Sequence, residues 1–188
     1  MVVIIKEYNL LISCPRNHER DAVAEVIYYL AEIGDENAEV APLNIPSLLA
    51  GKTNLEPIST VRKLRDLFKK DLIYVQFTQK FIPLEIMVKS SIENIKKAVD
   101  NLKYKIKDNE KFRITIEKRY TNLNKDKLIK EVADLISNKV DLNNPDKIIL
   151  IEIISDKTGI SIIRPDDILS IPILRRNAGM DITNNEFF

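Results

Sequence analysis

Few side chains in this sequence are of the kinds that do covalent chemistry. Among its 188 residues there is one cysteine, Cys14, and one histidine, His18. A single cysteine forms no internal disulfide, and these two residues cannot supply the usual ligands of a zinc site. No nucleophile is specified near His18, so we expect a surface histidine at a helix start and a small, buried cysteine at a strand end. A small enzyme with a site near Cys14 and His18 is the alternative.

Two further motifs lack what their chemistry needs. Gly51-Lys52-Thr53 resembles the end of a P-loop, but the glycine required five residues earlier is Pro46. Proline provides neither the backbone donor nor the left-handed torsion of a phosphate cradle. The adjacent pair Asp166–Asp167 is expected to cap or to face solvent, and the four glycines of the chain form no Gly-x-Gly-x-x-Gly fingerprint. We therefore expect no catalysis, no metal and no cofactor.

The clearer chemical signal is a concentration of cations. From Lys96 to Lys130 there are 12 Lys or Arg against 5 Asp or Glu, although the whole chain has a net charge of only +1. This segment includes FRITIEKRY (112–120), an alternating strand that ends on two adjacent cations and an aromatic ring. Segregated charge of this kind indicates a polyanionic partner, and a merely solvated surface is the alternative.

A second group of cations follows at a helix start. Asn124 is a suitable N-cap, and Lys125, Lys127 and Lys130 lie in the first turns of the helix after it. Cations there oppose the helix dipole at a small cost, unless the positive helix end is used to bind an anion.

The first half of the chain alternates strands and helices. We predict strands at 8–14, 38–43, 47–51 and 72–79, a helix capped by Asn17 and ended by Gly34, and a second helix that begins at Ser59 or Thr60. Strand, helix, strand, strand, helix, strand is the ferredoxin-like order.

The second half is also α/β. After Pro83 we predict a helix capped by Ser90 or Ser91, the strand 112–119 and the helix after Asn124. The turn SDKTG then joins two further strands, one with the apolar run Ile148–Ile154 and the other in GISIIRP (159–165). The run from Ile148 to Ile154 is apolar on both sides, which is typical of a central strand covered on both faces. No apolar run is long enough to cross a membrane, and the first residues lack a basic start followed by a long apolar core, so we expect no signal peptide and a cytoplasmic protein.

The succession from FRITIEKRY through the capped helix to VDLNNPDKIILIEIISDKTGISII resembles the THUMP domain of RNA-modification proteins. The residues that match the family's pattern are Phe112, Lys118, Arg119, Val140, Asp141, Leu142, Pro145, Asp146, Glu152 and Ile153. The resemblance implies a mixed α/β (α+β) fold with an N-terminal ferredoxin-like domain at 1–80, a THUMP-like RNA-binding domain at 81–173 and a polar C-terminal tail at 174–188.

The same resemblance implies a function. THUMP domains bind tRNA and deliver it to a modifying activity, and no modifying segment is recognised in this chain. It is therefore similar to the stand-alone adaptor that helps a separate acetyltransferase make 4-acetylcytidine in tRNA. A non-catalytic protein-interaction module is the rival interpretation.

The resemblance also assigns RNA contacts. Lys118 and Arg119 stand where a THUMP strand presents cations to RNA, and Tyr120 would stack on a base or else pack between the domains. The full set of expected RNA-binding residues is Lys111, Arg113, Lys118, Arg119, Tyr120, Lys125, Lys127, Lys130 and Arg164.

Overall fold

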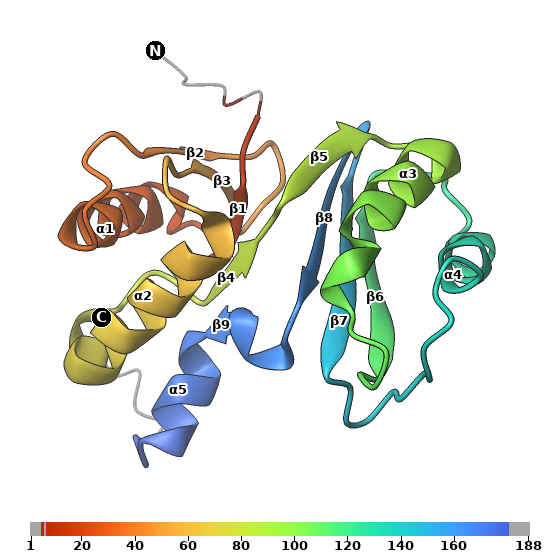
Figure 1. The fold of residues 1–188 in the computed structure, drawn as a ribbon. Helices are drawn as coiled ribbons and strands as arrows, with labels where there is room; N and C mark the ends of the chain where they lie inside the picture. The colour runs from red at the N-terminus through yellow and green to blue at the C-terminus, as the bar shows by residue number, and fades with distance from the viewer. Residues whose placement is uncertain (1–4, 6, 181–188) are drawn as a thin grey trace. The chain divides into compact units, whose positions relative to one another are not determined.

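The computed structural model describes residue 5 and residues 7–180. It divides into two compact units (Figure 1). Unit 1 is formed by the chain up to Pro83 together with the chain from Ile168 onward, and unit 2 runs from Leu84 to Asp167. The sequence predicts the change of domain at residues 80–81, whereas the division lies between Pro83 and Leu84.

Unit 1 contains the predicted ferredoxin-like arrangement. Its elements are β1 (Leu10–Ser13), α1 (Glu19–Glu32), β2 (Glu39–Pro42), β3 (Leu48–Lys52), α2 (Pro57–Asp71) and β4 (Lys80–Pro83). The strands lie in the order β2-β3-β1-β4 and all their pairings are antiparallel. Both helices contribute apolar side chains to one core with this sheet. Fully buried examples are Val26, Leu30, Leu64 and Phe68.

The helix ends of unit 1 follow local rules, with two corrections. Gly34 has a φ of +94°, and the N–H groups of Gly34 and Asp35 donate to the carbonyls of Ala31 and Leu30, which is the Schellman arrangement that ends α1. Helix α1 begins after His18, not with a cap by Asn17. Helix α2 begins earlier than predicted, because the Glu56 carboxylate accepts from the N–H groups of the second and third helical residues and proline fills the first position.

The predicted strand at 72–79 is wrong. Residues Leu72–Tyr74 form a 3₁₀ turn (η1) after α2, and the fourth strand of the sheet is β4 instead. The segment in between is held by Glu25 of α1, whose carboxylate accepts from the N–H groups of Gln76 and Phe77 and from the hydroxyl of Thr78. The backbone N–H groups of this segment therefore find hydrogen-bond partners on a distant helix. In a strand, a neighbouring strand would have supplied those partners.

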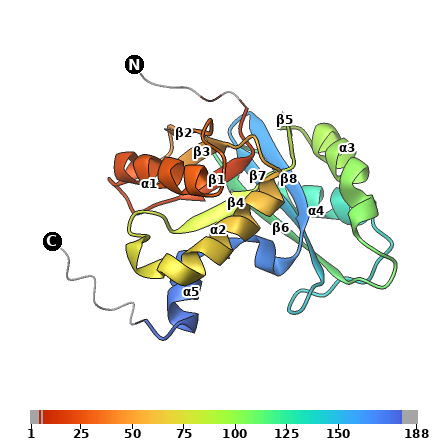
Figure 2. The ribbon, with the colours of Figure 1, turned by 60° about the vertical axis from the view of Figure 1, so that its left-hand side comes forward.

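The chain returns to unit 1 at its C-terminal end. Strand β9 (Leu169–Ser170) pairs with β4, and helix α5 (Ile171–Asn177) follows it and lies beside α2 (Figure 2). The expected division placed 168–173 with the second half and began the polar tail at 174. Leu169 and Ile171 are instead buried in the core of unit 1, and residues 174–177 are helical because Leu174 packs against that core. Residues 181–188 of the predicted tail lie outside the described residues.

Unit 2 is a four-stranded mixed sheet with two helices. Its elements are β5 (Ile86–Lys89), α3 (Ile92–Leu102), a 3₁₀ turn η2 (Lys103–Lys105), β6 (Phe112–Arg119), α4 (Lys125–Ala133), β7 (Lys147–Ile154), β8 (Lys157–Ile163) and a 3₁₀ turn η3 (Pro165–Asp167). The order is β5-β8-β7-β6, with β6 parallel to β7 and the other pairs antiparallel. Helices α3 and α4 cover the same face of this sheet, where Phe112 and Ile149 lie in the core.

The local predictions for unit 2 are confirmed. The side chains of Ser91 and Asn124 accept from backbone N–H groups three residues later and so cap α3 and α4. Strand β7 is central, and its side chains from Ile148 to Ile154 are buried on both faces. None of the described helices of either unit is long and apolar enough to span a membrane.

Candidate nucleic-acid interface

The two adjacent cations at the end of β6 point to opposite faces of the sheet, because side chains alternate along a strand. Lys118 lies on the face of Ile116, which is covered by α3 and α4. Its Nζ donates to the carbonyl of Leu123, 3.1 Å away, in the loop that leads into α4. Lys118 is exposed, so it presents its charge beside the start of that helix.

Arg119 lies on the other face, where it is paired with an acid. Its Nη1 donates to Oε2 of Glu152 on β7 at 2.8 Å. The Glu152 side chain is 2% exposed and that of Arg119 is 33% exposed. A buried carboxylate needs a cationic or hydrogen-bonding partner, so Arg119 supports the sheet rather than offering an unneutralised charge.

Tyr120 is the residue at which the chain leaves β6. Its φ of +53° lies in the left-handed region, which is rare for a bulky residue. Its side chain is 73% exposed. A strained backbone that holds an aromatic ring in solvent is the kind of outlier from which a functional hypothesis is drawn.

The start of α4 brings further cations to the same end of β6. The Oδ1 of Asn124 accepts from the N–H of Lys127 at 2.9 Å and so caps the helix. The side chains of Lys125 and Lys127 in its first turn are exposed. Lys130, also exposed, lies five residues after Lys125, in the last turn of the helix. We call Lys118, Tyr120, Lys125 and Lys127 the β6–α4 surface.

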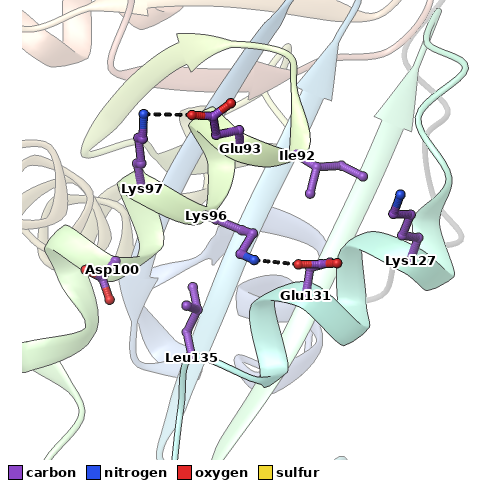
Figure 3. Close-up of a pocket in the computed structure, with 8 residues that line it drawn as sticks. All are labelled: Ile92, Glu93, Lys96, Lys97, Asp100, Lys127, Glu131 and Leu135. Carbon is purple, nitrogen blue, oxygen red and sulfur yellow. Dashed lines mark hydrogen bonds and ion pairs between the residues drawn. The ribbon is translucent and has the colours of Figure 1, made fainter.

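An open groove of about 580 Å³ separates α3 from α4 (Figure 3). Lys127 stands at its rim, and a pair between Lys96 Nζ and Glu131 Oε2, 2.5 Å apart, bridges the two helices. The hydrogen bond and positive charge of Lys96 lower the pKa of Glu131. Since acids and bases alternate around it, this groove is less positive than the β6–α4 surface; its lining residues are Ile92, Glu93, Lys96, Lys97, Asp100, Lys127, Glu131 and Leu135.

Three of the predicted RNA-binding cations lie at the opposite end of the sheet. Lys111 and Arg113 are at the start of β6, and Arg164 follows the end of β8, where Ile163 pairs with Ile148 and Ile148 with Arg113. Strand β6 spans eight residues, so roughly 20 Å separates the two ends. The structure therefore does not gather the nine predicted residues into one site.

Lys111 and Arg113 have structural partners in the loop 140–146. Lys111 Nζ donates to Asp141 Oδ2 at 2.6 Å, and Arg113 Nη1 donates to the carbonyl of Leu142 at 3.1 Å. The hydrogen bond from Lys111, with those from the N–H groups of Asn144 and Asn143, lowers the pKa of Asp141 to about 2. These contacts shape the loop that precedes β7.

The residues considered for covalent chemistry occupy ordinary positions. Cys14 is 1% exposed, and burial raises its pKa to about 11, so the reactive thiolate is disfavoured. His18 stacks on Phe77 with 5.6 Å between ring centroids. The hydroxyl of Thr53 is buried and donates to Asp35. Of the two roles expected for the pair Asp166–Asp167, capping or exposure to solvent, the buried Asp167 has a hydrogen-bonding one: its Oδ2 accepts from the N–H of Arg164 at 2.9 Å.

Sequence reasoning missed the partners of these cations. The available signal for the ion pair of Arg119 was a single glutamate, Glu152, inside the otherwise apolar run Ile148–Ile154. Within residue 5 and residues 7–180, no group of three or more His, Cys, Asp or Glu side chains is placed to hold a metal ion.

Comparison with known proteins identifies the second unit. Residues 89–163 match the family profile of the THUMP domain. No curated protein matches the chain significantly in sequence.

Solved structures share the fold. PH1313 from Pyrococcus horikoshii has a TM-score of 0.60 at 20% identity, over 84% of this chain and 55% of its own. TrmN from Thermus thermophilus has a TM-score of 0.57 at 12% identity, over 82% and 45%. A 4-thiouridine synthetase in complex with RNA and ATP has a TM-score of 0.53 at 20% identity, over 84% and 42%. The chain thus spans about half the length of each of these proteins.

Proposed function

We propose that this chain, whose residues 89–163 are a THUMP domain, binds tRNA and presents it to a separate modifying enzyme. The observation that carries the proposal is the β6–α4 surface, where Lys118, Lys125, Lys127 and Tyr120 are exposed at one end of that domain. The RNA bound to the similarly folded 4-thiouridine synthetase supports RNA as the ligand.

The chemistry of this surface fits a phosphate backbone. Each lysine that neutralises a phosphate releases condensed counterions, which gives affinity with little sequence information. The N-terminus of α4 adds backbone N–H groups and a positive dipole end to the same region. A single exposed aromatic such as Tyr120 can stack on an unpaired base. Recognition is then mainly of RNA shape.

The finer part of the proposal is that the modifying enzyme is an acetyltransferase that makes 4-acetylcytidine. It rests on the resemblance of the sequence to the stand-alone THUMP adaptor. The test is reconstitution of a candidate acetyltransferase with tRNA and acetyl-coenzyme A, with 4-acetylcytidine measured by mass spectrometry. Acetylation should require this protein; equal yields in its presence and absence would refute the adaptor role.

The binding itself is tested by titrating labelled tRNA at several salt concentrations, with duplex DNA as competitor. The variant Lys118→Ala/Lys125→Ala should bind more weakly and reduce the slope of log K against log[salt] by about two, because two phosphate contacts are lost. Lys107→Ala/Lys139→Ala is the matched control, since it removes two exposed lysines of the same unit away from the surface.

The outcomes separate the alternatives. A loss confined to the first variant supports the β6–α4 surface. Equal affinity in both variants and the parent protein would remove the assignment of the surface. No tRNA binding even at low salt would remove the proposed function and favour a protein-interaction module.

A further inference from the structure

The two helices of unit 1 carry opposite charge. From Glu19 to Glu36, on and just beyond α1, six Asp or Glu stand against one Arg. From Arg62 to Lys70 on α2, five Lys or Arg stand against one Asp. Helix α1 packs on β2 and β3, whereas α2 packs on β4 and β9. Unit 1 therefore has an acidic half and a basic half.

The cations of α2 fall into a structural group and an exposed group. Arg65 is half-buried, and its Nη2 donates to the carbonyl of Ile168 at 3.2 Å, so it fixes the returning chain. The exposed ones are Arg62, Lys63, Lys69 and Lys70. Lys69 has an acid 3.7 Å away, Asp66, and both side chains are well exposed, so that pair is weak.

The spacing of the exposed cations places them on one side of the helix. Seven residues separate Lys63 from Lys70, which is two turns and about 10 Å along the axis. Lys69 and Lys70 lie in the last turn, where cations stabilise the helix dipole. Arg62 and Lys63 lie in the middle of α2, where the dipole gives no such benefit.

Further exposed side chains follow close to the end of α2. Tyr74 of η1 is 69% exposed directly after the helix. Helix α5 contacts η1 and is held there by Arg175, whose Nη2 donates to the carbonyl of Val75 at 2.5 Å. The neighbouring Arg176 is exposed. In Figure 2, α2 and α5 lie next to each other. We use the name α2 basic face for the exposed α2 cations together with the exposed residues of η1 and α5 near the end of that helix: Arg62, Lys63, Lys69, Lys70, Tyr74 and Arg176.

We propose that the α2 basic face is a second RNA-backbone site, separate from the β6–α4 surface. This inference rests on the proposed function and adds a contact by the ferredoxin-like unit. Cations spaced along a helix with an exposed tyrosine at its end are the combination that neutralises phosphates and stacks on a base. The acidic α1 half repels a polyanion, so RNA lies on the α2 side of unit 1 only.

The test is tRNA binding by Lys63→Ala/Lys70→Ala at several salt concentrations. Alanine favours helix, so both substitutions leave α2 intact. The control, Arg20→Ala/Lys52→Ala, makes the same change in net charge on the α1 half, where both residues are exposed. We expect the first variant to bind about tenfold more weakly and to lose about two units of salt slope, with the control near the parent protein.

Each result decides the inference. A loss in the α2 variant and not in the control supports it. Equal losses in both pairs would show a general charge effect and overturn it. Unchanged binding by the α2 variant, while Lys118→Ala/Lys125→Ala loses affinity, would also overturn it and leave the proposed function standing; the basic face would then suit an acidic protein partner. Absence of tRNA binding by the parent protein would overturn both proposals.

Discussion

Arg119 and Glu152 form an ion pair across the parallel strands β6 and β7, with 2.8 Å between Nη1 and Oε2. The acid is almost completely buried, and the arginine covers it from the edge strand. The pair gives Arg119 a structural role. The sequence alone does not distinguish Arg119 from its neighbour Lys118, since both are cations at the end of the same strand.

We predict that Arg119→Ala lowers the free energy of unfolding by about 1–3 kcal/mol, because it removes the arginine that pairs with a buried carboxylate. Chemical denaturation followed by circular dichroism measures this. The double variant Arg119→Ala/Glu152→Gln should recover part of the loss, since it removes the buried negative charge as well. A loss of RNA affinity with unchanged stability would instead make Arg119 an RNA contact.

Replacing Tyr120 by glycine should separate stability from binding. Glycine tolerates the φ of +53°, so Tyr120→Gly should relieve about 1 kcal/mol of backbone strain. Glycine also loses more backbone entropy on folding, which offsets this gain. The variant should therefore be as stable as the parent protein or more stable. If the ring stacks on a base, tRNA binding falls by about 1–3 kcal/mol. The control is Ser47→Gly in unit 1, at a φ of +65°, which should leave binding unchanged. Parent-like affinity of Tyr120→Gly would exclude stacking.

Acid should weaken unit 2 through Asp141. Its pKa is lowered from 3.8 to about 2 in the folded protein, mainly by Lys111. A depressed folded pKa contributes stability that is present above the unfolded pKa and is lost as the pH falls toward the folded one. Urea unfolding between pH 5 and about pH 2 should therefore show a shallower fall for Asp141→Asn than for the parent protein. Identical pH profiles would show that the pair does not contribute.

The returning segment should be essential to unit 1. Leu169 is fully buried in that unit's core, so Leu169→Ala should cost about 2–5 kcal/mol. Hydrogen exchange resolves where the loss occurs: amides of α2 and β4 should exchange faster, and those of β7 in unit 2 should not. Ile173→Ala is the control, because the Ile173 side chain is exposed on α5. Equal protection of α2 in Leu169→Ala and the parent protein would contradict this role.

Periodicity and capping residues were sufficient to predict most elements of both units. Ser91, Asn124 and Gly34 act through neighbours within five residues, so their roles are readable from the chain. The segment 72–79 was wrongly predicted as a strand because its side chains do alternate in the sequence. Its backbone conformation is instead set by hydrogen bonds to Glu25, about fifty residues earlier.

The candidate site was less readable for the same reason. Whether a lysine or arginine is available to a ligand depends on acids that are distant in sequence: Asp141 is 30 residues from Lys111, and Glu152 is 33 residues from Arg119. The side of the sheet that each residue occupies follows from alternation, but its ion-pair partner does not.

The pairing of β9 with β4 has a consequence for how the chain is made. Unit 2 is continuous in sequence, whereas unit 1 is completed only by residues that emerge from the ribosome after all of unit 2. Domains generally fold as units during synthesis. Unit 2, which comes later in the sequence, can therefore reach its native structure before unit 1 does. Until β9 has been synthesised, the edge of β4 that it pairs with remains unpaired.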